Sequence, residues 1–331
     1  MKKIQSVFIP ALLGITLIML SSWGFLVHKT AHQLAVYELP KEIQPFFFKN
    51  IDYLVANSIR PDQRRNEDPT EATKHFIDLE AYGDDAALKM PLHWDDAVKK
   101  YSKDTLLKYG YVPYHVVFMK EKLTAAFKSN NKDSILFYAA DIGHYIEDAH
   151  VPLHTSINYD GQLTNQKGLH SLWESTVPGL EINQYQLSSK HKATYLNDPS
   201  LAIWTAVRKA NTLLKDVFAK ETELTKIFTD AEKYRTQTSR GREFKNYTPA
   251  FAKAYGEALK NTINEQLISS ADLVADFWYT AWVDAGKPDL SGLFSLNDED
   301  KAALRKGQNS FQNNTLIRDS LLMSLKGSRV E

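Results

Sequence analysis

The sequence predicts an all-α protein built as a single multi-helix domain. Three observations carry this prediction: several long segments repeat apolar residues at helical spacing, proline, glycine and asparagine punctuate them, and no convincing run alternates between apolar and polar residues. The chain has 331 residues, of which 43% are hydrophobic and 24% are charged. This is ordinary globular composition, and the length allows a sizeable core.

The first 22 residues are predicted to be a secretory signal peptide. Two lysines form a basic start, Val7 to Leu20 is apolar but short for a bilayer-spanning helix, and Ser21 and Ser22 suit a cleavage site. An uncleaved membrane anchor is the alternative. We therefore expect a secreted or periplasmic protein whose mature chain begins at Trp23. Since it contains no cysteine, its core or a structural metal must hold it together.

The first half of the chain contains five expected helices. Residues 31–39 open with apolar residues at helical spacing, and 43–55 contains an aromatic run that is typical of a core. A short helix follows at 95–101. Pro113 and the Asn130-Asn131 pair then delimit two stronger segments. These two helices are expected at 114–128 and 134–150.

Two further helices are expected in the second half, at 201–222 and 251–285. The first contains good helix formers, and Gly286 and Pro288 stop the second. Polar loops are expected at 159–167 and 183–200. The folded domain is expected to span residues 23–288. The more polar tail, 289–331, has one weak amphipathic stretch at 316–325 and is expected to be appended and loosely ordered.

The stretch from His144 to Glu174 carries the chemistry of this chain. His144 and Asp148 are four residues apart, as are His170 and Glu174, so each pair projects from one face of a helix. Imidazole and carboxylate groups together are zinc ligands. With His154 between the two pairs, the pattern predicts a site that holds more than one metal ion.

Two upstream pieces extend this pattern. One runs from Asp62 in Arg60-Pro-Asp62-Gln-Arg-Arg65 to His75 in Lys74-His75-Phe76-Ile77-Asp78, and the other joins Trp23 to His28. Each piece alone is weak, because a lone histidine in an apolar segment is usually a core residue. Their combination in this order is much less expected by chance.

The combination resembles the superfamily of zinc-dependent phospholipases C and single-strand-specific zinc nucleases of the S-one/P-one type. Asp148-Ala-His150-Val-Pro-Leu-His154 is similar to a nuclease phrase, whereas Gly168-Leu-His170-Ser-x-x-Glu174 is closer to the phospholipases. Both branches share His75-Phe76-x-Asp78. The spacing of Trp23 and His28 and the phrase Asp62-x-x-Arg65 lean toward the nucleases. The resemblance covers the mature chain up to the tail.

The resemblance implies a cleft with three zinc ions. The first would be held by Asp62, His75, His144 and Asp148, the second by His154, His170 and Glu174, and the third by the amino group and carbonyl of Trp23 with His28 and a shared Asp148. Zinc-bound hydroxide would then attack phosphorus. The second ion, with three protein ligands, would keep a position for water or phosphate, as catalytic sites do.

Five residues are expected to serve the reaction or the substrate. Asp62 could orient or deprotonate the attacking water, and Arg65 could donate a charge-assisted hydrogen bond to a phosphate oxygen. Phe76, Asp78 and Asn158 are expected to contact the substrate. For Asp78, a place behind the metal ligands or a local cap is the alternative.

The leading expectation is a secreted, monomeric zinc-dependent phosphodiester hydrolase with no obligate protein partner. Its substrate would be a phospholipid or single-stranded nucleic acid. Asn158 and the Gly-x-His-Ser-x-x-Glu phrase place a phospholipase C-like activity ahead of a nuclease. The formal net charge of zero favours neither, since bound zinc would add positive charge. The alternatives are a non-catalytic, zinc-stabilised binding protein and an unrelated helical protein with core histidines.

The proposed role of Trp23 gives a first prediction. Its α-amine becomes available only after cleavage, so one extra residue before Trp23 is expected to remove one zinc equivalent. Metal analysis of the extended protein, beside protein that starts at Trp23, measures the difference. Equal zinc contents would sink this hypothesis.

Overall fold

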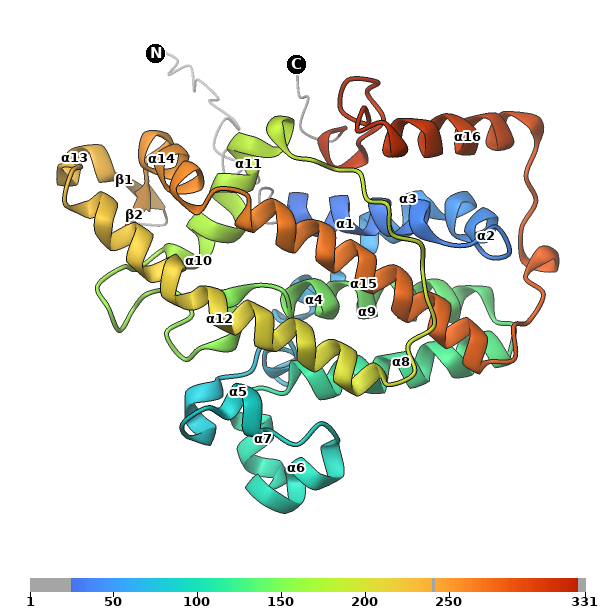
Figure 1. The fold of residues 1–331 in the computed structure, drawn as a ribbon, viewed down its shortest axis with the longest axis horizontal. Helices are drawn as coiled ribbons and strands as arrows, with labels where there is room; N and C mark the ends of the chain where they lie inside the picture. The colour runs from blue at the N-terminus through green and yellow to red at the C-terminus, as the bar shows by residue number, and fades with distance from the viewer. Residues whose placement is uncertain (1–24, 240–241, 327–331) are drawn as a thin grey trace, which may run out of the picture.

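The computed structural model describes residues 25–239 and 242–326 and confirms the all-α class (Figure 1). The signal peptide predicted for residues 1–22 and the proposed ligand Trp23 lie outside the described residues. The α-helices are α1 (Phe25–Glu38), α2 (Gln44–Lys49), α3 (Ile51–Asn57), α4 (Arg60–Arg64), α5 (Ala86–Lys89), α6 (Trp94–Tyr101), α7 (Lys103–Tyr109), α8 (Val112–Lys128), α9 (Lys132–Asp148), α10 (Leu169–Ser171), α11 (Val177–Glu181), α12 (Pro199–Thr225), α13 (Asp230–Lys233), α14 (Pro249–Leu259), α15 (Thr262–Asp284) and α16 (Asp298–Gln312). Short 3₁₀ turns are η1 (Ala72–Lys74), η2 (Leu79–Tyr82), η3 (Pro152–Thr155), η5 (Ile182–Gln184), η6 (Ser291–Leu293) and η7 (Met323–Leu325), and η4 (Leu172–Thr176) is a π-helical turn.

Two of the expected helices are each divided in two. The segment expected at 251–285 breaks at Lys260, which adopts a φ of 55° and ends α14 before α15 begins. The segment expected at 43–55 breaks at Asn50, whose side chain donates to the carbonyl of Phe46 at 2.7 Å. Neither break contains glycine or proline, so the apolar periodicity runs through both without a stop signal.

A β-hairpin stands where no strand pair is expected from the sequence. Strands β1 (Tyr234–Ser239) and β2 (Arg242–Tyr247) pair antiparallel, with Tyr234 opposite Tyr247. The rings of these two tyrosines lie 5.0 Å apart. Most other side chains of the hairpin are exposed, so the sequence lacks the alternation of a half-buried strand.

The tail packs against α1 instead of forming a loosely ordered appendage. An Asn297 capping box starts α16, and Phe311 near its end is fully buried and stacks on Tyr37 of α1. The amphipathic stretch at 316–325 forms turns, and its buried leucines join the core around α1. The polar composition of the tail gives no sign of this packing, because only a few apolar residues of the tail contact the core.

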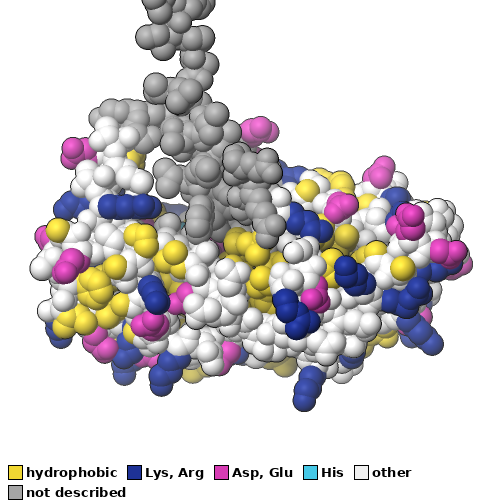
Figure 2. Space-filling view, turned by 90° about the horizontal axis from the view of Figure 1, so that it is seen from above, with side chains coloured by type: hydrophobic (Ala, Val, Ile, Leu, Met, Phe, Trp, Pro, Cys, Tyr) yellow, Lys and Arg dark blue, Asp and Glu magenta, His cyan; other side chains and the backbone are white. Residues whose placement is uncertain are grey.

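The two long helix pairs form the body of the molecule. α8 and α9 form a hairpin, and α12 and α15 cross in front of it (Figure 1). The buried apolar residues form two clusters, and α1 and α15 contribute to both. On the face seen in Figure 2, acidic and basic side chains are interspersed, in line with the neutral net charge. Among residues 25–239 and 242–326, no helix combines the length and apolarity needed to cross a bilayer.

A glycine lets α1 approach α9 closely. A Cβ at Gly143 would lie 2.4 Å from Nε2 of His32. The two helices can therefore pack at this distance because residue 143 of α9 has no side chain. This approach places the rings of His28 and His144 in a stack, with centroids 4.2 Å apart. Gly143 therefore determines whether two of the proposed ligands meet.

Replacing Gly143 by alanine is expected to destabilise the protein by about 1–3 kcal/mol through overpacking. This exceeds the roughly 1 kcal/mol that such a change gains in an ordinary helix interior, because His32 is fully buried and cannot yield. Chemical denaturation measures the change.

Gly256→Ala is the matched control. It sits in α14, and its added Cβ would meet the end of the Glu181 side chain, which can swing aside. A Gly143→Ala variant as stable as this control would show that the contact with His32 is not tight.

Candidate metal centre

The carboxylate of Asp148, the last residue of α9, lies among four imidazoles. It is 1% exposed. Its oxygens lie 2.8 Å from His75 Nδ1, 3.2 Å from His144 Nε2, 3.7 Å from His154 Nδ1 and 3.8 Å from His28 Nε2. The helix therefore delivers its final carboxylate to the point where histidines from four segments meet.

The first proposed ligand set comes together around His144. Its Nε2 lies 3.1 Å from His75 Nδ1 and 3.9 Å from an oxygen of Asp62. Asp62 comes from α4, and His75 follows η1 directly. Tertiary packing thus brings Asp62, His75 and His144 together and places Asp148 beside the two histidines, as expected for this set.

The second proposed set, His154, His170 and Glu174, also assembles. His170 Nε2 lies 2.9 Å from His154 Nε2 and 2.7 Å from Glu174 Oε2. His154 belongs to η3, His170 to α10, and Glu174 to the π-helical turn η4. π-Helical turns occur frequently at functional sites. The side chain of His170 is 31% exposed, so this end of the centre opens to solvent.

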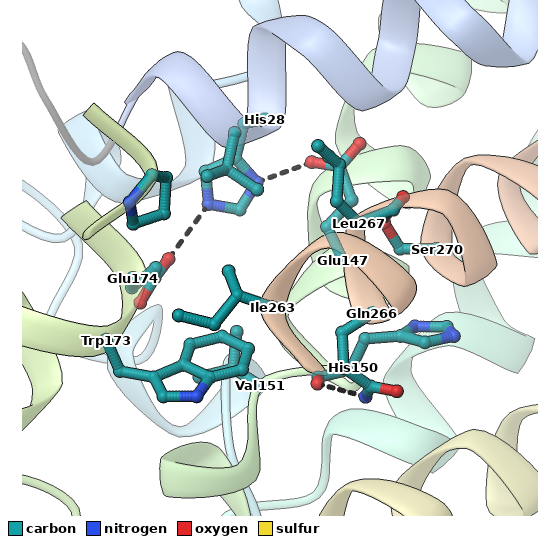
Figure 3. A pocket seen from close by; sticks show the side chains of 12 residues that line it. His28, Glu147, His150, Val151, Trp173, Glu174, Ile263, Gln266, Leu267 and Ser270 are labelled. Atoms are coloured by element: carbon teal, nitrogen blue, oxygen red, sulfur yellow. Dashed lines mark hydrogen bonds and ion pairs between the residues drawn. The ribbon is translucent and has the colours of Figure 1, made fainter. Parts of the chain in front are cut away.

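His28 links the two sets from α1. Its Nε2 lies 3.4 Å from Glu174 and 3.8 Å from Asp148, whereas its Nδ1 lies 2.5 Å from Glu147 (Figure 3). His28, His144 and Asp148 form a third group of neighbouring donor atoms. The further ligand expected there, Trp23, lies outside the described residues.

Backbone carbonyls hold the outer nitrogens of His144 and His154, which leaves their Nε2 atoms facing the other donors. Nδ1 of His144 lies 2.8 Å from the carbonyl oxygen of Ser58, and Nδ1 of His154 lies 2.8 Å from that of His75. A carbonyl only accepts, so both Nδ1 atoms are donors and both Nε2 atoms carry lone pairs toward the centre. Buried lone pairs that converge in this way call for a cation between them.

The spacing of the donor atoms suits metal ions. Tetrahedral zinc with Zn–N bonds of about 2.0–2.1 Å separates its ligand atoms by about 3.3 Å. The neighbouring donors of the first two sets lie 2.8–3.9 Å and 2.7–3.7 Å apart. Imidazole and carboxylate form a zinc-like donor set, and the described residues can therefore hold several metal ions.

The buried acids of the centre are ionised. Burial opposes the charge of Asp148, but the neighbouring histidines, His144 first, outweigh it and hold the pKa of Asp148 well below its usual value. Burial likewise opposes ionisation of Glu174, and His170 keeps its pKa well below the usual range. Ionised carboxylates beside imidazoles form a donor set that suits divalent cations.

The residues expected to serve catalysis lie at the open edge. Asp62 and Arg65 have side chains that are 29% and 46% exposed, and Arg65 Nη1 lies 3.4 Å from Asp62 Oδ1. Both are therefore accessible to solvent beside the first ligand set.

The three expected substrate contacts differ in their surroundings. Phe76 is half-buried and packs against Gly110. Asp78 precedes η2 without making a side-chain cap, and burial, with the nearby Glu80, raises its pKa to about 6. Asn158 is 8% exposed and bonds to Leu163 N and to the Thr164 hydroxyl, so its side chain shapes the loop instead of facing a ligand.

Two acidic residues beside the ligands were not anticipated from the sequence. Glu147 accepts from His28 and also lies 2.7 Å from His32 Nδ1. Glu71, fully buried, lies 3.5 Å from His75 Nε2. The Glu71-x3-His75 spacing equals that of His144 and Asp148, so it was a usable signal.

Two hollows adjoin the centre. A cavity of about 20 Å³, room for roughly one water, lies behind His28 against Trp173 and Ile263 (Figure 3). A larger groove of about 730 Å³ runs from the loop at Asp160 and Gly168 to the hairpin. Asp160 Oδ1 lies 3.4 Å from the backbone N–H of His170, so the groove begins beside the exposed ligand.

No protein-family model matches the sequence, and comparison with curated proteins finds no significant match.

Zinc added to chelator-treated protein is expected to raise its melting temperature. One site at a free zinc concentration of about 100 Kd contributes about 2.7 kcal/mol. His170→Ala should reduce the rise, because it removes one of three donors. His93→Ala, which changes an exposed histidine outside the donor groups, should leave it unchanged. Equal rises in the two variants would contradict metal binding at His170.

Proposed function

We propose that this protein is a zinc-dependent phosphodiester hydrolase of the phospholipase C type, with up to three zinc ions in the centre. The observation that carries the proposal is the convergence of the expected donors: all eight expected ligands within the described residues lie in three neighbouring groups around Asp148. The resemblance to zinc-dependent phospholipases C and nucleases rests on these same residues.

The second ligand set supports a catalytic centre over a purely structural one. His154, His170 and Glu174 supply three donors, and structural zinc sites usually have four protein ligands. Zinc, when bound, lowers the pKa of a coordinated water to about 7 and polarises a phosphoryl oxygen. The solvent-exposed side of His170 gives a substrate access to this set.

Residues at the open edge supply the remaining chemistry. Asp62 has an exposed carboxylate that can orient the attacking water or accept its proton. Arg65, beside it, carries guanidinium donors that can bind a non-bridging phosphate oxygen. These roles require a phosphate group between the exposed Asp62 side and the exposed His170 side.

The loop beside His170 favours a phospholipid over a nucleic acid. Its exposed side chains include Ile157, Tyr159 and Leu163, which are 41%, 54% and 67% exposed. Asn158 and Gln162 fix the loop by hydrogen bonds, so these apolar groups stay outward. Apolar groups at the rim suit the surface of a lipid aggregate. A nucleic acid would instead require a basic groove, and the larger groove carries acidic and basic residues together.

A side-by-side assay tests the function. The zinc-loaded protein is expected to hydrolyse phosphatidylcholine in vesicles and bis-p-nitrophenyl phosphate, and a chelator should abolish both activities. His154→Ala should lower kcat/KM by at least about 100-fold, more than the loss of an outer-shell partner usually costs. Leu163→Glu should lower hydrolysis of vesicles alone, whereas Leu88→Glu, equally exposed on α5, should change neither activity.

The remaining outcomes separate the alternatives. Hydrolysis of single-stranded DNA without hydrolysis of phosphatidylcholine would replace the phospholipase with the nuclease. Zinc binding without hydrolysis of any of the three substrates would replace the enzyme with a zinc-stabilised binding protein.

A further inference from the structure

We propose that Glu71 is a positioning residue that holds the His75 ring with Nδ1 toward the first metal site. This inference rests on the metal centre of the proposed function but not on its substrate. It assigns Glu71 a task that neither the sequence pattern nor the ligand sets contain.

Two carboxylates flank the His75 ring on opposite sides. Asp148 Oδ2 lies 2.8 Å from Nδ1, and Glu71 Oε1 lies 3.5 Å from Nε2. A neutral imidazole carries one proton, which can serve only one of these acids. If the proton sits on Nδ1 and serves Asp148, the inner nitrogen has no lone pair for a metal.

Glu71 supplies the charge that can hold the proton on Nε2 once a metal occupies Nδ1. His75 Nε2 has no hydrogen-bond partner among the described residues, and Glu71 Oε1, 3.5 Å away, is an acceptor toward which it can turn. Metal-bound histidines commonly donate their outer N–H to a carboxylate, which fixes the tautomer and raises ligand basicity. Glu147 stands in the same relation to His28, at 2.5 Å.

The surroundings keep Glu71 ionised and fixed. It is fully buried, and it accepts hydrogen bonds from Arg64, from Lys74 at 2.6 Å and from the Tyr145 hydroxyl. Two cationic side chains and a hydroxyl therefore compensate its buried charge and fix its orientation. Because several hydrogen bonds fix the Glu71 carboxylate, its position can determine the orientation of the His75 ring.

Through Arg64, the Glu71 carboxylate is also connected to α4 and α9, which carry Asp62 and His144 of the first site. Arg64 donates to Glu71 at 3.0 Å and also to Asp141 of α9 at 3.0 Å. Arg64 lies on α4, the helix that carries Asp62. Removing the charge of Glu71 therefore affects His75 directly, whereas removing that of Asp141 disturbs the arginine without reaching the imidazole.

The test compares Glu71→Gln with Asp141→Asn. Glu71→Gln is expected to weaken zinc binding at the first site about 10- to 100-fold, the usual effect of losing such a partner. Asp141→Asn should keep the wild-type affinity for zinc. It removes a buried carboxylate that bonds to the same arginine but does not contact His75. Competition with a chromophoric chelator measures affinity, and circular dichroism shows whether each variant folds.

A second measurement reads the position of the proton directly. In zinc-loaded wild-type protein, long-range ¹H–¹⁵N NMR should find His75 bound through Nδ1 and protonated on Nε2, whereas in metal-free protein the proton should sit on Nδ1 and serve Asp148. Zinc bound through Nε2 in the wild-type protein would overturn the proposal, as would equal losses of affinity in the two variants. Neither experiment uses a substrate, so failure of the proposed hydrolase activity would leave both results readable.

Discussion

The buried carboxylate of Asp148 at the end of α9 is the constraint on which the rest of this structure depends. A helix C-terminus carries partial negative charge and favours cations, yet the last turn of α9 ends in Glu147 and Asp148 and has no basic residue. Burial makes this charge more costly. Histidines from four segments surround the pair. An acidic helix C-terminus breaks a local rule, and proteins tend to break such rules at functional sites.

The arrangement of the helices follows from bringing those histidines together. Because Gly143 lacks a side chain, α1 can pack close to α9, and His32 of α1 then contacts Glu147 of α9. His28 then reaches the centre from α1 with its outer nitrogen already bonded to Glu147. The tail covers the other side of α1 through Phe311. Apolar packing and the polar centre therefore fix the same helix.

Exposure divides the centre into a closed and an open part. His28, His144 and Asp148 are buried, and a carboxylate and a carbonyl hold the outer nitrogens of the two histidines. Asp62 and His170 face solvent. The neighbouring loops can therefore change without disturbing the donors. The phospholipid and nucleic-acid hydrolases proposed above would share this centre and differ at its rim.

The sequence by itself determined the helical class and two of the donor pairs, because both rest on local spacing. The remaining donors were implied by the resemblance to a known superfamily. Apolar residues at helical intervals predict helices, and residues four apart such as His144 and Asp148 share a face wherever the helix packs. The division of 251–285 at Lys260, the hairpin and the packing of the tail lacked such local signals. Only the tertiary structure decided which donors meet, that Asn158 serves its own loop, and that Glu71 and Glu147 stand behind the imidazoles. Those contacts join residues far apart in the chain, and their distances depend on how closely the helices pack, which no periodicity encodes.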